Sequence, residues 1–206
     1  MSKLIDWFDE ICPETIVLGY GSLMNQSSRE TYNNINSLCL PVKVHGWKRE
    51  WVTRSVAEQQ TYVGAIQAQN SVINAQAVPS VIDQMLLKRE VDYRFVEIQP
   101  DSVQFTKEVC PEIRQKINNS NIYICESLLI EAPTKKFPVY QSYLDTCLAG
   151  CIEVGGEMEA TAFMRSTSGW PSFGVIDDRA APRYPRVGHI SKESYEIIDS
   201  VLSEYE

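Results

Sequence analysis

The chain has 206 residues, of which 44% are hydrophobic and 22% charged, and its formal net charge is −8 at pH 7. These values are typical of a globular protein with a sizeable core, and the acidic balance argues against general nucleic-acid binding, which needs a basic surface. No run of about eighteen apolar residues occurs, and the opening stretch MSKLIDWFDE lacks the apolar region of a signal peptide. We therefore expect a cytoplasmic protein with no membrane partner.

The first half of the chain predicts several strands. Thr15 to Gly19 is an apolar run, and Pro41 to Val52 alternates apolar and polar residues. Thr61 to Gln69 and Val72 to Val78 are predicted as two further strands joined by a short polar turn. A helix is predicted to begin at the pair Pro79–Ser80, with apolar residues at helical spacing as far as Glu90.

The second half predicts strands, helices and one long loop. Alternation returns in Tyr93 to Pro100, and the segments SVQFTKEV and NIYICESLLI are also predicted as strands. Pro138 opens a second helix, and the stretch from Glu157 to Arg165 fits either a helix or a loop. The prolines and glycines of SGWPSFGVIDDRAAPRYPR predict a loop, and SKESYEIIDSVLSEYE predicts an amphipathic helix. This order of strands and helices is not a regular βαβ alternation, so it predicts an α+β fold built on a curved or closed sheet.

The cysteines and histidines do not predict a metal centre. The chain has two histidines and no CxxC pair, so their spacing resembles no zinc site. Cysteine in an apolar run behaves as a small hydrophobe. We therefore expect reduced, mostly buried thiols at the six cysteine positions, which are Cys12, Cys39, Cys110, Cys125, Cys147 and Cys151.

A Gly-Tyr-Gly-Ser turn, Gly19 to Ser22, directly follows the first apolar run. Glycine is needed where the backbone bends sharply or a ligand comes close, and strand-to-helix turns present N–H groups that suit anions. A dinucleotide site is disfavoured because Met24 stands where the third glycine belongs. The GxSxG of a hydrolase elbow and the Gly-Lys-Ser/Thr of a phosphate loop are absent as well. A tight structural corner is the plainer alternative.

Four short motifs occur in order between Thr15 and about Gly155. The first strand ends in Tyr-Gly-Ser-Leu, and the segments VKVHGWKREW, QMLLKREVDYRFVEI and PVYQSYLDTCL follow. In this order they resemble the γ-glutamylcyclotransferase-like superfamily, which includes ChaC-type glutathione-degrading enzymes and γ-glutamylamine cyclotransferases. Nothing in the tail from Glu157 onward matches a motif. We therefore expect a single domain over residues 1–206, in which residues 157–206 are a C-terminal extension of unassigned role.

The resemblance implies a small mixed β-barrel core with flanking helices. It also implies γ-glutamyl cyclotransfer, in which the α-amine of a small γ-glutamyl compound attacks its own γ-carbonyl and 5-oxoproline is released. No metal or organic cofactor is needed. Glu90 matches the catalytic base, and Tyr143 matches a substrate-lining tyrosine, for which Tyr140 is the alternative. The cradle of the γ-glutamyl group would be formed by Tyr20, Gly21, Ser22 and Leu23.

One departure from the family pattern bears on Glu90. Val91-Asp92 follows it where family members commonly carry glycine, which affects how the carboxylate is aimed. A glutamate beside Lys88 and Arg89 is also typical of a solvated helix end. The rival function is therefore a non-catalytic binding or regulatory module that retains the cradle. Hydrolysis or acyl transfer to an external nucleophile is a third possibility.

The proline-rich loop carries three arginines, Arg179, Arg183 and Arg186. One interpretation is that this loop folds over the cleft and that its arginines recognise an anionic group, such as a substrate carboxylate. The other, which the sequence favours, is an ordinary surface loop whose arginines pair with Asp177 and Asp178.

Overall fold

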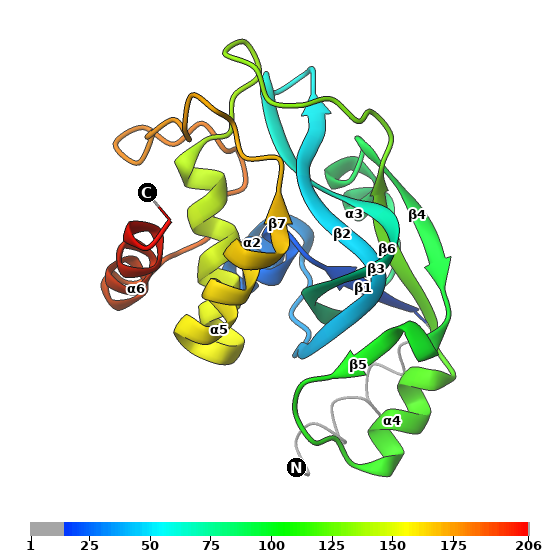
Figure 1. The fold of residues 1–206 in the computed structure, drawn as a ribbon. Coiled ribbons are helices and arrows are strands. Elements are labelled where there is room, and N and C mark those ends of the chain that lie inside the picture. The colour runs from blue at the N-terminus through cyan, green and yellow to red at the C-terminus, as the bar shows by residue number, and fades with distance from the viewer. Residues whose placement is uncertain (1–14, 206) are drawn as a thin grey trace.

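In the computed structural model, residues 15–205 are described, and they form a curled mixed sheet flanked by helices (Figure 1). The strands are β1 (Thr15–Gly19), β2 (Leu40–Ser55), β3 (Gln60–Pro79), β4 (Tyr93–Ile98), β5 (Val103–Phe105), β6 (Asn121–Ser127) and β7 (Thr167–Ser168). The α-helices are α2 (Gln26–Asn33), α3 (Gln84–Arg89), α4 (Pro111–Asn118), α5 (Gln141–Ser166) and α6 (Lys192–Ser203). Two short 3-10 helices are η1 (Ser22–Met24) and η2 (Pro100–Ser102).

The sheet has seven strands and curls on itself. Its order is β4-β6-β1-β3-β2-β5, with β7 added to β2. β1 lies parallel to β6 and antiparallel to β3, and β3 reaches β6 again where Ala65 pairs with Glu126. The sheet is therefore a half-barrel rather than a flat layer, which confirms the predicted α+β class with a curved mixed sheet and flanking helices.

The β2–β3 hairpin differs from the sequence-based expectation. The two strands predicted at residues 61–69 and 72–78 are one continuous strand of 20 residues, and no turn interrupts it near Asn70. The 16-residue β2 supplies partners to both halves of β3, and the register between them shifts beside Gly46, where φ is +82°. Trp47 pairs with Gln67 and His45 pairs with Val72, so residues 68–71 of β3 lie opposite Gly46 without partners in β2, and the pairing resumes on either side of them.

Two helical expectations also need correction. The helix predicted from Pro79–Ser80 begins later, at Gln84, because Pro79 ends β3 and the Asp83 carboxylate caps the helix by accepting from the Leu86 amide at 2.9 Å. The ambiguous segment 157–165 is helical and belongs to α5, which is kinked at Gly156. α2 and α4 were not expected from the sequence, because each has eight mostly polar residues with little apolar periodicity.

The other expected elements agree with the structure. β1, β4 and β6 lie where alternation or apolar runs predict strands, and α6 follows the proline-rich loop. Of the segment SVQFTKEV only Val103–Phe105 forms a strand. Described cysteines are all unpaired, and Cys125, Cys147 and Cys151 are buried, whereas Cys12 and the opening stretch lie outside the described residues. Within residues 15–205 no helix has the length and apolarity needed to cross a membrane.

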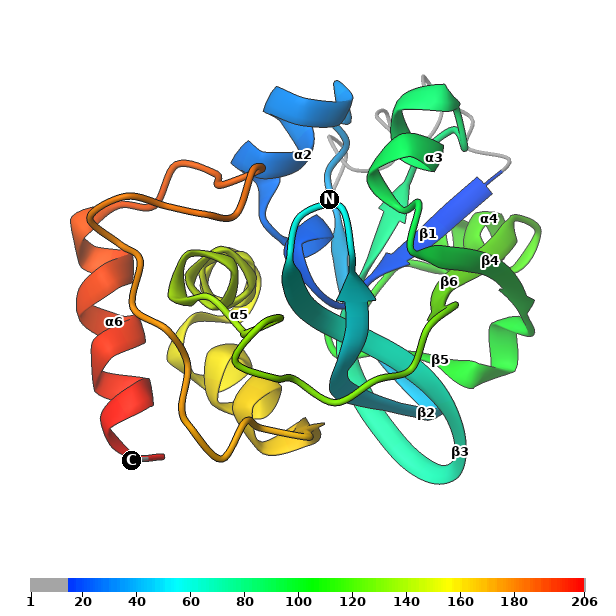
Figure 2. The same cartoon turned by 90° about the horizontal axis from the view of Figure 1, so that it is seen from above.

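Helix α5 is the central packing element of the molecule. Figure 2 places it between the sheet and α6. Its residues Leu144, Cys147, Leu148 and Cys151 are at most 1% exposed and join the same core as β1. Burial of this apolar surface is the main stabilising term, and it fixes α5 against the turn that follows β1.

We expect Gly150→Ala to destabilise the protein by about 1–3 kcal/mol, measured by denaturant unfolding. A Cβ atom at Gly150 would lie 2.4 Å from the Asn25 amide nitrogen and 2.4 Å from the Met24 carbonyl carbon, so backbone has to move. Gly155→Ala, in the same helix, is the control, because its Cβ would meet only the flexible Glu159 side chain. Equal losses of stability in both variants would contradict this account of α5 packing.

Candidate active site

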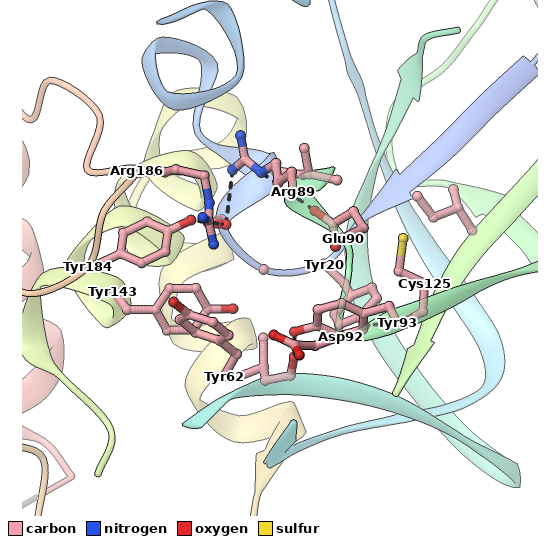
Figure 3. A pocket seen from close by; sticks show the side chains of 15 residues that line it. Tyr20, Tyr62, Arg89, Glu90, Asp92, Tyr93, Cys125, Tyr143, Tyr184 and Arg186 are labelled. Carbon is pink, nitrogen blue, oxygen red and sulfur yellow. Dashed lines mark hydrogen bonds and ion pairs between the residues drawn. The ribbon is translucent and has the colours of Figure 1, made fainter. Parts of the chain in front are cut away.

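A pocket lies where the ends of β1 and α3 meet the beginning of α5 (Figure 3). Its walls come from the turn after β1, from β3, from the segment joining α3 to β4, from β6 and from α5. The last wall is the C-terminal loop, which is the proline-rich loop that precedes α6. Segments far apart in the sequence therefore meet at one place. The sheet order explains part of this, because β1 pairs with both β3 and β6.

The turn after β1 is shaped by close packing against α5. Gly21 has a φ of −131° and a ψ of −134°, and it directly precedes η1. A Cβ atom there would lie 2.8 Å from the Tyr143 hydroxyl and 3.0 Å from Val63 Cγ2. Ser22 and Leu23 begin η1 and line the pocket, and the first N–H groups of a helix have no acceptor inside it. These amides are donors that a ligand in the pocket can use.

Tyr20 joins three strands through its hydroxyl group. The hydroxyl donates to the carbonyl oxygen of Cys125 on β6 and accepts from the Ala65 amide on β3 at 3.1 Å. The side chain is 4% exposed, and burial raises the pKa of the phenol well above its usual value. Tyr20 is therefore neutral and fixed, and it offers its ring to the pocket while its hydroxyl stays committed to the backbone.

A chain of polar contacts connects the turn with α3. Arg89 donates from Nη2 to Ser22 Oγ at 3.0 Å and from Nη1 to Asn33 Oδ1 at 2.6 Å. Its Nε lies 3.5 Å from Oε1 of Glu90, and the Arg89 side chain is only 2% exposed. This arginine therefore holds the turn and the end of α3 at a fixed separation.

Glu90 lies in the pocket, next to the turn. Its side chain is 10% exposed, so the interpretation as a solvated charge is wrong. Burial raises the pKa of its carboxyl group, although Arg89 and Arg186 oppose that shift. Among the described residues the only non-glycine positions with positive φ are Asn34 and Gln59, so the turn through Val91 and Asp92 has no need of glycine. The departure from the family pattern leaves Glu90 inside the pocket.

Tyr143 rather than Tyr140 reaches the pocket. Tyr140 precedes the first turn of α5 and is not part of the pocket wall, whereas Tyr143 is 4% exposed and packs at the turn. The Tyr143 ring centroid lies 4.6 Å from that of Tyr62 and 4.9 Å from that of Tyr184. The three rings form one aromatic wall opposite Glu90.

The proline-rich loop contributes residues that the sequence did not assign to the site. The side chain of Arg179 pairs with Asp145 and with Asp199, each at 2.7 Å. Arg186 lines the pocket and pairs with Glu58 at 2.9 Å. The favoured interpretation, in which these side chains pair with aspartates 177 and 178, is therefore wrong. The arginine cluster itself was the signal that the loop reaches the cleft.

Other residues of the pocket gave no sequence signal. Aromatic residues and a cysteine inside strand patterns are indistinguishable from core residues, and an aspartate in a turn is ordinary. Burial and the nearby Glu58 raise the pKa of the Asp92 carboxyl group. The additional pocket residues are Tyr62, Arg89, Asp92, Tyr93, Cys125 and Tyr184.

The arrangement is suited to proton transfer beside a set of backbone donors. A carboxyl group with a raised pKa in a cleft is a candidate general base or acid, and amides at a turn stabilise negative charge that develops on an oxygen. Within the part of the chain that the structure describes, no group of three or more His, Cys, Asp or Glu side chains is placed to hold a metal ion.

The comparisons with known proteins concern the fold. The sequence matches no protein-family model and no curated protein. A solved structure described as a gamma-glutamyl cyclotransferase superposes with a TM-score of 0.51 and 14% identity, over 90% of this chain and 98% of that one. YkqA from Bacillus subtilis superposes with a TM-score of 0.52 and 12% identity, over 74% of this chain and 54% of that one, so the chain spans about half the length of YkqA. The resemblance to γ-glutamylcyclotransferase-like proteins is thus confirmed in the fold.

Glu90→Gln is expected to be more stable than the wild type at pH 7, and the difference should disappear below about pH 4.5. The folded-state pKa of Glu90 lies above the unfolded-state value, near 4.5, so ionisation favours the unfolded state as the pH rises through this window. Glutamine has no charge to lose. Urea unfolding at several pH values measures the difference, and a difference that does not change with pH would contradict the raised pKa.

Proposed function

We propose that the protein is a γ-glutamyl cyclotransferase that releases 5-oxoproline from a small γ-glutamyl compound. Glutathione, a γ-glutamyl amino acid and a γ-glutamylamine are the substrate classes considered. One observation carries the proposal: the enclosed carboxyl group of Glu90 and the turn from Tyr20 to Leu23 line the same pocket, although about seventy positions separate them. The fold shared with a gamma-glutamyl cyclotransferase of known structure supports it.

In the proposed reaction, Glu90 first removes a proton from the α-ammonium group of the substrate. The freed amine attacks the γ-carbon, so that a C–N bond closes a five-membered ring and the carbonyl electron pair moves onto oxygen. When the tetrahedral intermediate collapses, the bond to the leaving amine breaks, and Glu90 returns the first proton to that amine. The second proton, which the ring nitrogen still carries, then passes by way of Glu90 to the released amine, which leaves as an ammonium ion. Electrons and protons balance within the substrate and one carboxyl group, so the step requires no cofactor.

The turn would serve the oxygen on which negative charge develops. Amides at the start of η1 are fixed donors, and they need no reorganisation when the tetrahedral intermediate forms. Removing one such donor from an enzyme commonly costs about 10²–10³ in kcat. The hydrogen bonds that Ser22 accepts from Arg89 and Tyr184 hold these amides in place.

The aromatic wall would fold the substrate. Because nucleophile and electrophile belong to one molecule, the site has mainly to hold the glutamyl chain in its attacking shape, and orientation of this kind contributes up to ~7–11 kcal/mol. The rings of Tyr62, Tyr143 and Tyr184 contact one another and are held by packing. Rigid rings suit this task, since they lose little conformational entropy on binding.

Glu90→Gln should lower kcat/KM for 5-oxoproline formation by about 10²–10⁴-fold, because the variant cannot take the ammonium proton. The assay offers wild-type protein glutathione, a γ-glutamyl dipeptide and a γ-glutamylamine, and 5-oxoproline and glutamate are quantified by chromatography. Glu97→Gln is the matched control, because Glu97 is an exposed glutamate of β4 that does not line the pocket, and it should keep full activity.

Each other outcome of this assay has a distinct meaning. Glutamate as the product would indicate attack by water. An absence of product with all three substrates would favour the non-catalytic module. Normal turnover by Glu90→Gln would refute the assignment of the base, even if the reaction is cyclotransfer.

The pH dependence of kcat/KM should show an acidic limb with an apparent pKa above 4.5. Glu90 must be ionised to act as a base, and burial raises its pKa above that value. The residual activity of Glu90→Gln should lack this limb. A limb that persists in the variant would assign the titration to another group.

A further inference from the structure

The C-terminal loop, residues 177–190, is fastened over the pocket at both ends. Near its start, Arg179 pairs with Asp145, whose side chain is 1% exposed, at 2.7 Å. Near its end, the carbonyl oxygen of Arg186 accepts from Ser28 Oγ at 2.7 Å. The loop therefore lies in a defined position against α5 and α2.

Two side chains of this loop form one wall of the pocket. Tyr184 is 2% exposed, and its hydroxyl donates to Ser22 Oγ at 2.6 Å. The Arg186 guanidinium lies 5.2 Å from the centroid of the Tyr184 ring. This wall touches the turn to which the γ-glutamyl group is assigned, so a ligand on that turn also meets the loop.

The two arginines of the pocket differ in the exposure of their side chains, which is 2% for Arg89 and 19% for Arg186. Arg89 donates to Asn33, Ser22 and Ser28 through its terminal nitrogens, and its Nε lies 3.5 Å from Oε1 of Glu90. Arg186 uses Nη1 and Nη2 on Glu58, at 2.9 and 3.5 Å. Among the described residues, the buried Nε–H groups of both arginines have no hydrogen-bond acceptor. Arg186 is therefore the arginine that is more accessible to a ligand.

The charged side chains on the two sides of the pocket are complementary to the two charged groups on the α-carbon of a γ-glutamyl compound. Figure 3 places Arg186 on one side and Glu90 with Asp92 on the other. The α-carbon of the substrate carries an ammonium group and a carboxylate group. The carboxyl groups of the protein would attract the ammonium, and the guanidinium would attract the carboxylate.

We propose that Arg186 binds the α-carboxylate of the substrate and thereby directs the α-amine toward Glu90. This assignment rests on the proposed function for the identity of the ligand. Glu58 would position Arg186, since it accepts from both terminal nitrogens and also from the Tyr62 hydroxyl group. Selectivity for a free α-carboxylate would then be supplied by the C-terminal loop.

The test compares 5-oxoproline with 5-oxoprolinamide, which has a carboxamide in place of the carboxylate, by titration calorimetry. Wild-type protein should bind 5-oxoproline about 10–100-fold more tightly, the preference expected from a charge-assisted hydrogen bond. Arg186→Gln should lose most of this preference, and Arg186→Lys should keep part of it. Arg183→Gln is the control, because Arg183 is an exposed arginine of the same loop outside the pocket wall, and it should keep all of it.

The same comparison is made in turnover, with a γ-glutamyl compound and its α-carboxamide analogue. One outcome is that the wild type turns over neither compound but binds the carboxylate more tightly, and that Arg186→Gln abolishes this preference. That outcome would support the role of Arg186 and refute the enzymatic function. Turnover in which Arg186→Gln discriminates as the wild type does would overturn the role of Arg186 and leave the function standing. A wild type that binds both compounds equally would also overturn it. Thermal unfolding of each variant verifies that it is folded, and Arg186→Lys decides the question should Arg186→Gln not fold.

Discussion

The hydroxyl oxygen of Ser22 joins three distant parts of the chain. It accepts from Arg89, 67 positions away, and from Tyr184, 162 positions away, so the turn after β1, the end of α3 and the C-terminal loop meet at one atom. Hydrogen bonds to a charged donor and to a buried phenol are strong only if all partners are held in place. The packing of α5 against the turn, where Gly21 lets the Tyr143 hydroxyl approach, supplies that rigidity.

Burying the charged side chains of Glu90 and Arg89 costs free energy. The contacts around these two side chains indicate why the fold keeps them. Glu90 and Arg89 are nearly inaccessible to water, and taking two ions out of water commonly costs more than their attraction returns. Arg89 offsets part of the cost through neutral acceptors on Asn33 and two serines. The result is a carboxyl group that ionises less readily than in water, and such a group is a stronger base once it is ionised.

The sequence predicted those elements that are determined by residues close together in the chain. β1 and the turn that follows were evident from one apolar run and two glycines, and α3 ends at Glu90 as its periodicity indicated. The continuity of β3 through Asn70 was not evident from the sequence, because it depends on the length of the partner strand β2. The pocket wall at Tyr184 was missed for the same kind of reason: its partner Ser22 lies at the other end of the chain. The order of the motifs predicted that Glu90 and the turn meet, whereas for the C-terminal loop only its three arginines pointed to the cleft.

In the C-terminal loop, the side chains that anchor the loop differ from the side chains that line the pocket. Its anchor at Arg179 and Asp145 lies outside the pocket, and the Asp178 carboxylate accepts from the Ser142 amide at the start of α5, at 2.7 Å. Substitution of the Arg186 side chain can therefore change what meets the ligand without removing the anchors. Tyr184, in contrast, also holds the turn through Ser22. Anchors of this kind, which are contacts within the chain, reduce the conformational entropy that a loop loses when a ligand binds, so they would favour binding by the proposed Arg186 contact.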